Sequence, residues 1–302
     1  MVFPSGEQFR ISAGDHVAVV TESGAALRLL QHRGRDLVHP FAEDRMSSGG
    51  RGQLLVPWPN RIRDGRYSFG GRDLQLGLTD PGHGNASHGL ARWAAWTLEE
   101  HTDTSVSLVY RVMAQTGYPW ALDLHVLYDL SADGLVVTQT ATNLSPEPAP
   151  YASGAHPYLC VGDTIEDLEL HLPVRTRVLL DDRRLPTGRS EPVSGAYDFT
   201  SPRRVGDVVL DDAFGDLEHA GGRATATLRD PGSGHGVQLW VDERHRWLQV
   251  YTPPADGPRP AVAVEPMTAP VDAFNSGTDV VVLSPAGQDG DEVSASWGLR
   301  AL

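Results

Sequence analysis

The sequence predicts an all-β protein, a large antiparallel β-sandwich formed by a single domain over residues 1–302. Three observations lead to this prediction. Gly (32 residues) and Pro (22 residues) are frequent and spread through the chain. Few windows have the 3.6-residue period of an amphipathic helix, whereas short apolar or alternating runs recur between turn sequences. The length of 302 residues is large for one domain, but all-β domains reach this size.

The expected strands are short, and several alternate between apolar and polar residues. Even positions from 122 to 130 carry Leu, Leu, Val, Tyr and Leu, which predicts one face packed on a core. A turn at Tyr118-Pro119-Trp120 should join this strand to the one before it in a hairpin or meander. We expect strands at His16–Val20, Ala26–Leu30, Ser105–Val112, Leu122–Leu130, Leu135–Thr142, Leu168–Leu172, Gln238–Val241, Trp247–Tyr251, Val262–Val264 and Val280–Ser284.

Composition excludes several classes of partner. The formal net charge is −14, from 39 acidic residues against 25 basic ones, and every basic residue is Arg. Phosphate binding needs a concentrated basic surface, so we expect no nucleic acid and no anionic membrane as partner. Neither a signal peptide nor an 18-residue apolar stretch is apparent, and the chain has a single cysteine. These features predict a cytoplasmic protein whose ligand is a small molecule.

The motifs of metal-dependent, nucleotide-dependent and covalent catalysis are missing from the sequence. Twelve histidines are present, but none forms an HExxH motif or a close pair with carboxylates at ligand spacing. GxSxG, P-loop and GxGxxG sequences are also absent. Cys160 follows two apolar residues and is expected to be a buried thiol. We therefore expect no metal and no cofactor.

Glu265 follows the apolar run Val262–Val264 and precedes Pro266, which predicts an acid at the end of a strand. A carboxylate held there by a rigid proline can be aimed into a cavity. The alternative is an ordinary acid that faces solvent where the strand becomes a loop.

Four other polar motifs lie in expected loops, and three of them have a structural alternative. Arg61 can bind hydroxyl or carboxylate oxygens or form a structural ion pair. His88 precedes Gly89, which permits close backbone approach, but it can equally be a loop histidine without function. Pro157 makes the backbone at His156 extended. Asp211 and Asp212 form an acidic pair of the kind common in solvated turns.

Taken in order, these motifs resemble the aldose 1-epimerase (galactose mutarotase) family. The resemblance spans about residues 15–300, with His88-Gly89-Leu90-Ala91-Arg92-Trp93 closest to bacterial, broad-specificity branches. Leu90 stands where galactose mutarotases usually have a second Gly, a departure that puts a preference for galactose in doubt. The matching motifs are Asn60-Arg61-Ile62…Gly65, His88-Gly89, His156-Pro157-Tyr158, Asp211-x-x-Phe214 and Glu265-Pro266…Pro270-x-Asp272-Ala273-x-Asn275.

The resemblance implies a galactose mutarotase-like supersandwich with a sugar cleft on one broad face and no cofactor. It implies that Glu265 is the general base and His156 the general acid. The implied substrate-binding residues are Asn60, Arg61, His88 and Asp211. Asp211 is preferred to its neighbour Asp212 because the family pattern places the acid three residues before the Phe. We also expect one or two of the seven tryptophans to line the cleft, and the protein to be a monomer or a homodimer.

The implied reaction is the interconversion of the α and β anomers of an aldohexose. Opening a hemiacetal requires one oxygen to lose a proton while another gains one, which a carboxylate and a protonated imidazole can do together. A protonated His156 requires a nearby acid or a negative field. Two alternatives remain: a hexose 6-phosphate 1-epimerase, for which Arg63, Arg66 and Arg72 are candidate phosphate ligands, and a non-catalytic carbohydrate-binding protein on the same fold.

Overall fold

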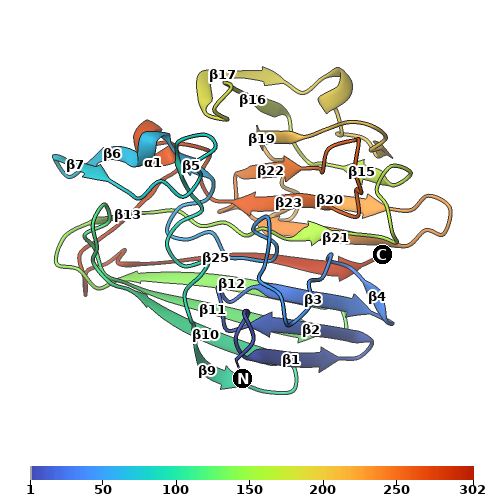
Figure 1. The fold of residues 1–302 in the computed structure, drawn as a ribbon, viewed down its shortest axis with the longest axis horizontal. Helices are drawn as coiled ribbons and strands as arrows, with labels where there is room; N and C mark the ends of the chain where they lie inside the picture. The colour runs from blue at the N-terminus through green and yellow to red at the C-terminus, as the bar shows by residue number, and fades with distance from the viewer. Residues whose placement is uncertain (1) are drawn as a thin grey trace.

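The structure, a computed structural model, describes residues 2–302 and consists almost entirely of antiparallel β-strands. A nine-stranded sheet forms one layer (Figure 1). Its central strands are ten residues long and pair in continuous register, so this sheet is the largest rigid element of the fold. Its order is β18 (Arg203–Arg204), β15 (Glu169–His171), β20 (Arg223–Arg229), β21 (Gly236–Asp242), β25 (Glu292–Ala301), β12 (Gly134–Asn143), β11 (Leu122–Ser131), β10 (Ser105–Val112) and β9 (Thr97–His101).

Two further sheets face this layer. The four-stranded sheet at the N-terminus lies over the β10–β11 end, where β1 contacts both strands and β2 contacts β11 (Figure 1). The six-stranded sheet carries the candidate site. Its order is β14 (Tyr158–Leu159), β23 (Val262–Met267), β22 (Trp247–Tyr251), β19 (Asp211–Gly215), β16 (Thr176–Leu180) and β17 (Pro186–Pro192), and the N-terminal sheet comprises β1 (Gln8–Ala13), β2 (His16–Thr21), β3 (Leu27–His32) and β4 (Arg35–Asp36).

Three short strand pairs and three single-turn helices complete the described fold. The pairs are β5 (Arg61–Ile62) with β8 (Ala86–Ser87), β6 (Arg66–Phe69) with β7 (Arg72–Gln75), and β13 (Ala149–Tyr151) with β24 (Val281–Leu283). The helices are η1 (Arg63–Gly65), η2 (Gly195–Tyr197) and α1 (Ala273–Ser276). Within residues 2–302, no helix combines the length and apolar character needed to cross a bilayer.

The predicted strands are confirmed, with ends displaced by at most a few residues. The predicted hairpin is β10–β11, in which Val112 pairs with Leu122 and Val106 with Tyr128. Along β11 the even positions are buried and the odd ones partly or fully exposed, as the alternation predicted. Trp120 in the connecting turn is 1% exposed, so the turn is packed into the core rather than solvated.

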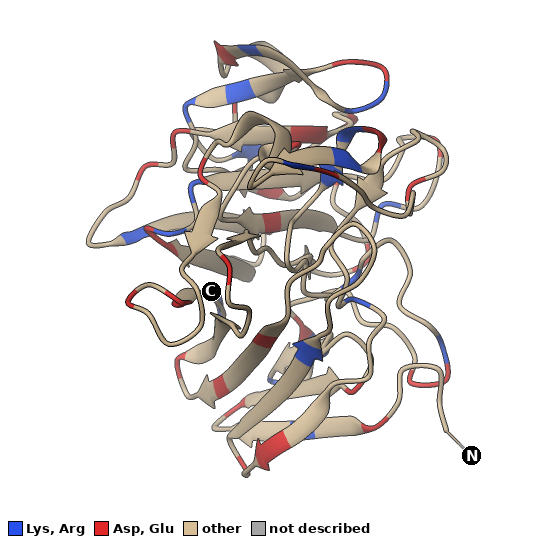
Figure 2. Ribbon diagram, turned by 90° about the vertical axis from the view of Figure 1, so that its left-hand side faces the viewer, with Lys and Arg blue, Asp and Glu red and all other residues tan. Residues whose placement is uncertain are grey.

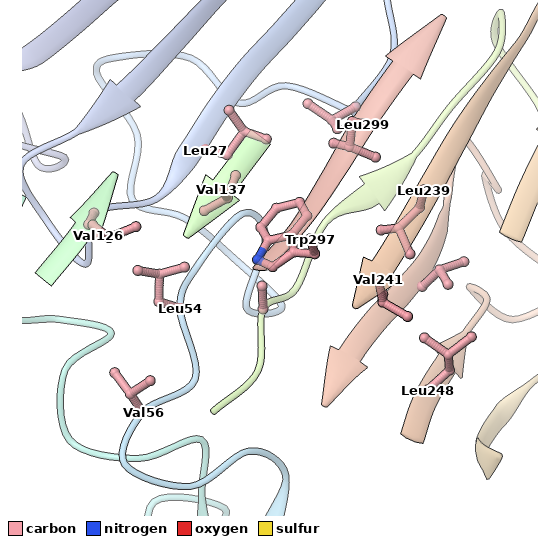
Figure 3. Packing of buried hydrophobic residues seen from close by; sticks show 14 of the residues in the cluster. Leu27, Leu54, Val56, Val126, Val137, Leu239, Val241, Leu248, Trp297 and Leu299 are labelled. Carbon is pink, nitrogen blue, oxygen red and sulfur yellow. The ribbon is translucent and has the colours of Figure 1, made fainter. Parts of the chain in front are cut away.

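One hydrophobic cluster joins the three large sheets. Trp297 of β25 lies among Leu27 of β3, Val137 of β12 and Val241 of β21 (Figure 3). Leu248 of β22 belongs to the same cluster, so the six-stranded sheet shares the core of the nine-stranded one. Within residues 2–302 the three large sheets therefore share one hydrophobic core, and the single domain that the sequence indicates stays a prediction.

The two faces of the six-stranded sheet have different roles. On β23, Val262 and Val264 point into the shared core, while Ala263 and Glu265 point the other way. The loops that contain residues 49–61 and 79–93 cover this second face, and the cleft lies between them and the sheet. Acidic and Arg residues are interspersed along the surrounding strands and loops (Figure 2).

Candidate active site

Three adjacent strands place polar side chains in one row on the outer face of the six-stranded sheet. Glu265 of β23 is directly opposite Gln249 of β22. The next strand, β19, contributes Asp211, which accepts a hydrogen bond of 2.8 Å from the amide of Gln249. This row puts an acid, an amide and an acid on one face of a rigid sheet, which fixes their directions. Asp211 is in register with Tyr251, so it meets Gln249 diagonally.

Glu265 lies inside its strand, not at the end as the sequence predicted. β23 continues through Pro266 to Met267, because Pro266 does not need to donate a hydrogen bond to β22. Its carbonyl accepts from Ala155 N on the opposite side, so its nitrogen also points toward that side. A proline is tolerated at such a position, so β23 continues beyond Glu265 and its backbone is fixed both before and after this residue. The side chain of Glu265 is 3% exposed.

His156 approaches the row from the segment before β14. Its backbone N–H donates to Gln53 O and its carbonyl accepts from Gly52 N, so the loop at residues 49–61 holds it in place. Its Nε2 lies 3.2 Å from Oε1 of Glu265. The ring stacks on Tyr158, with ring centroids 5.0 Å apart and planes inclined by 6°. The predicted acid and base are thus in direct contact.

A glycine makes the position of the His156 ring possible. Gly50 has a left-handed backbone with φ +75°, and a Cβ there would lie 2.5 Å from Cδ2 of His156. Gly89 behaves similarly beside the cleft: at φ +72° a Cβ would lie 2.0 Å from Val56 O. The close backbone approach expected of Gly89 is therefore confirmed.

Burial favours the neutral form of both catalytic candidates. Burial lowers the pKa of His156 to about 3. Burial also raises the pKa of Glu265 well above its ordinary value, and the negative charge of Asp211 raises it further. A protonated His156 with an ionised Glu265 contains the same number of protons as the neutral pair. The two states differ only in which side of the 3.2 Å contact holds one proton. The contact supplies the nearby acid that a protonated His156 requires.

His88 and Asn60 hold each other at the opposite wall. Both have left-handed backbone, with φ of +61° and +52°. Asn60 N donates to Nδ1 of His88 at 3.2 Å, and His88 N donates to Asn60 O at 2.8 Å. Since Nδ1 accepts, the ring proton is on Nε2. Burial, and then the neighbouring His156, lower the pKa of His88 well below its ordinary value, so it acts as a neutral hydrogen-bond donor.

Arg61 forms an ion pair, which the sequence offered as its structural role, but this ion pair lies at the edge of the cleft. Its Nε donates to Oδ2 of Asp80 at 2.7 Å, and both residues line the cavity. Burial raises the pKa of Asp80, but hydrogen bonds from Arg61 and His83 outweigh burial, so the net pKa lies below 3.8. The pairing orients the guanidinium without removing it from the cleft.

Asp211, rather than Asp212, faces the cleft. Besides the bond from Gln249, its Oδ2 lies 3.4 Å from Nε of Arg184. Asp212 points to the other face of β19 and lies 3.7 Å from Nη1 of Arg177. The alternation of the strand thus supports the choice between the two acids that the family pattern suggested.

All six predicted site residues line one cleft of about 370 Å³. Sequence reasoning missed other polar and aromatic residues that line it. Gln249 and Tyr251 share one face of a predicted strand, but the sequence does not show that Gln249 lies opposite Glu265. Asp80, Arg92 and Trp93 come from loops whose path the sequence does not define. The lining residues missed are Asp80, Arg92, Trp93, Tyr158, Gln249 and Tyr251, with Gly49, Gly50, Thr79, Pro81 and Ser87.

Several other predictions concern residues around the cleft. Among the tryptophans, Trp93 lines it and is 48% exposed at its rim, whereas Trp58, Trp96, Trp120, Trp240 and Trp297 are buried. Cys160 is a buried free thiol, as expected, and burial raises its pKa to about 12. Within residues 2–302, no three His, Cys, Asp or Glu side chains gather in a way that could hold a metal ion.

Comparisons with known sequences point to one family. Residues 7–290 match the profile of the aldose 1-epimerase family. The protein YihR of Escherichia coli strain K12 is 34% identical over 281 residues, which cover 92% of this chain and 89% of YihR. The maltose epimerase of Levilactobacillus brevis is 29% identical over 265 residues, which cover 78% of this chain and 76% of that enzyme.

Solved structures show the same fold. A galactose mutarotase-like protein from Clostridium acetobutylicum superposes with a TM-score of 0.86 at 20% identity, covering 97% of this chain and 94% of that one. An aldose epimerase homologue from C. elegans gives 0.85 at 20% identity, covering 98% of each chain. The supersandwich architecture is thereby confirmed, and the profile match together with YihR decides the family. The chain is a member of the aldose 1-epimerase family.

Proposed function

We propose that the protein is a mutarotase, which interconverts the α and β anomers of an aldohexose. The observation that carries the proposal is the pair of His156 Nε2 and Glu265 Oε1, 3.2 Å apart in the floor of a cleft lined with polar groups. A buried acid and a buried base in contact, with pKa values shifted in opposite directions, are typical of acid–base sites.

In the proposed reaction Glu265 accepts the proton of the anomeric hydroxyl. Its Oε2 is buried and has no hydrogen-bond partner in residues 2–302, so it is available to a ligand. His156 donates a proton to the ring oxygen, the bond between this oxygen and the anomeric carbon breaks, and the aldehyde forms. Rotation about the adjacent carbon–carbon bond presents the other face, and the reverse proton transfers close the ring.

The proton balance of the site returns to its starting point after each turnover. Glu265 gains the proton that His156 loses when the ring opens. When the ring closes, the hydroxyl that attacks the aldehyde loses a proton to His156, and the new anomeric oxygen takes one from Glu265. The reaction involves neither an oxidation nor a group transfer, so these two side chains suffice for its chemistry.

The remaining cleft residues are proposed to hold the sugar hydroxyls. His88 offers a neutral Nε2–H donor, Arg61 a charged donor and Asp211 an acceptor. Asn60 places His88 through its backbone, and its own side chain accepts from Arg61 at 3.4 Å. Trp93 at the rim offers an aromatic face of the kind on which sugar rings stack.

A phosphorylated hexose is the second candidate substrate. The arginines suggested for it are engaged elsewhere: Arg63 with Asp181 and Asp272, Arg66 with Gln75, and Arg72 with Glu147. Arg92 instead lines the cleft and makes no ion pair with residues 2–302, and this observation favours an anionic substituent. Arg92→Gln should then raise the KM for glucose 6-phosphate about tenfold or more and leave that for glucose unchanged.

The test of the proposed function is polarimetry on fresh α-D-glucose, followed by galactose, arabinose and glucose 6-phosphate. Acceleration of the approach to equilibrium supports the proposal, and the ranking of kcat/KM identifies the substrate. Binding of these sugars without any acceleration would instead support the alternative of a non-catalytic carbohydrate-binding protein.

A further inference from the structure

A second cavity, of about 210 Å³, lies behind the catalytic segments and shares no lining residue with the cleft. One wall is the inner face of the nine-stranded sheet at β12 and β25. The opposite wall includes Ser153, three residues before His156, and Thr268, three residues after Glu265. Thr268 N donates to Ser153 O, and Ser153 N donates to the hydroxyl oxygen of Thr268, so the segments that carry the catalytic pair are joined between the two cavities.

The unusual feature of this cavity is Gln139. It lies in the core-facing row of β12, between Val137 and Ala141, and is 4% exposed. Its cross-strand neighbours are Val126 and Ala295, whose side chains cannot form hydrogen bonds. Neither its amide nitrogen nor its amide oxygen has a hydrogen-bond partner within residues 2–302. A buried amide left unpaired destabilises a fold, so its presence in a central strand calls for a partner from outside the chain.

The other polar residues of β12 show how such groups are normally satisfied in this sheet. On its outer face Thr138 pairs with Ser296 and Thr140 with Ser294, through hydroxyl contacts of 2.9 and 2.7 Å. Gln139 is the inward-facing exception, and it faces the cavity rather than a neighbouring strand.

Three residues with hydroxyl groups share this cavity with Gln139, and the hydroxyl of one of them, Thr268, is already hydrogen-bonded to the backbone of Ser153. Tyr151, Ser153 and Thr268 line the same cavity and are 3%, 1% and 8% exposed. Burial raises the pKa of Tyr151, although its hydrogen bond with Ser153 acts in the opposite direction, so its phenol stays neutral. An amide and neutral hydroxyls can each donate and accept, which matches a ligand whose own groups do both.

The charges and shape further restrict the ligand. Glu243 and Arg244 at the mouth have opposite charges, and Arg246 is paired with Asp279 at 2.9 Å, so the mouth has no net charge. Apolar side chains, including Val280 and Val293, line the remaining wall. The volume lies below the roughly 300 Å³ of ordinary small-molecule pockets. A neutral, compact molecule with hydroxyls on one side and C–H groups on the other fits these conditions.

We propose that this cavity is a second binding site, for a small neutral polyol, with Gln139 as its central hydrogen-bonding residue. The alternative is a hydrated cavity, since 210 Å³ corresponds to about seven waters at the roughly 30 Å³ each occupies in the liquid.

Xylitol is a suitable probe because it has no anomeric centre and cannot be turned over. Its binding is measured by calorimetric titration of the full chain, of Gln139→Leu and of Asp211→Ala, which removes an acceptor from the cleft only. We expect Gln139→Leu to weaken xylitol binding at least tenfold and Asp211→Ala to leave it unchanged. A crystal structure with xylitol should show it against Gln139.

Folding does not confound the test, because replacing an unpaired buried amide by an apolar side chain of similar size is neutral or stabilising. Thermal unfolding should therefore give Gln139→Leu a Tm at or above that of the unmodified protein. Binding that is lost in Asp211→Ala and kept in Gln139→Leu would place xylitol in the cleft and overturn the proposal. Absence of binding up to about 100 mM xylitol would also overturn it and identify a water-filled cavity. None of these outcomes depends on mutarotase activity.

Discussion

Replacing Glu265 by Gln tests the proposed base with the least structural change. Gln has nearly the same shape, so it can keep the contact with His156 Nε2 that now measures 3.2 Å. It cannot accept a proton from a hydroxyl under assay conditions. The substitution therefore removes the proposed chemistry and retains the packing of a strand that is buried along its whole length.

The expected loss of activity follows from the role of a general base. Such a group contributes about 10² to 10⁴ in rate, or about 2.7 to 5.4 kcal/mol of transition-state stabilisation at 1.36 kcal/mol per tenfold. We expect kcat/KM for mutarotation of α-D-glucose to fall by this factor, as followed by polarimetry. Glu100→Gln, at an exposed position on β9, is the matched control and should retain full activity.

The stability of Glu265→Gln should also depend on pH differently from that of the unmodified protein. A carboxyl whose folded-state pKa is raised stabilises the fold below its unfolded pKa and loses that contribution as pH rises through the folded pKa. Gln does not titrate, so the Tm of Glu265→Gln relative to the unmodified protein should rise as pH increases above the ordinary pKa of a Glu carboxyl. Full mutarotase activity in a folded Glu265→Gln protein would refute the assignment of the base.

Three further substitutions test other parts of the site. Asp211→Asn keeps the shape of the side chain but removes its charge, and should raise KM about tenfold with a smaller effect on kcat, as steady-state polarimetry would show; an unchanged KM would exclude Asp211 from substrate binding. Gly50→Ala places a methyl group 2.5 Å from Cδ2 of His156 and should lower kcat about 10²-fold by moving the ring, whereas normal kcat would mean that the ring position is not critical. The pKa of Asp80 in the folded protein lies below 3.8, so its carboxylate stabilises the fold above that pH and loses this contribution as pH falls through the folded pKa. The Tm of the unmodified protein should therefore exceed that of Asp80→Asn most near neutral pH, and the difference should vanish in strong acid. A Tm difference that does not change with pH would contradict this explanation.

The strands could be predicted because their signals are local. The alternation from 122 to 130 and the apolar run at 262–264 both depend on neighbouring residues, and both gave strands with the expected buried faces. The end of β23 was misplaced for a physical reason. Pro266 normally ends a strand, but whether it does so depends on which side its nitrogen faces, and that depends on the partner strands.

The site residues were predicted from short motifs and their order, not from contacts. His156 and Glu265 are 109 positions apart, and nothing local to either indicates a 3.2 Å contact. Gln249 was missed although its strand was predicted, because its importance comes from being opposite Glu265 in register. Arg92 and Trp93 depend on the path of a loop, which is determined by packing against distant strands.

The register of β23 links correct folding to the proposed activity. This strand is buried on both faces, with Val262 and Val264 in the core and Glu265 in the cleft. A slip of one residue against β22 would exchange the two sets, placing a carboxylate among apolar side chains and a valine in the cleft. Burying the carboxylate without a partner is strongly unfavourable, so a misregistered chain should be unstable rather than folded and inactive. In a population of this protein, the folded fraction and the fraction with a correctly placed Glu265 should therefore be the same quantity.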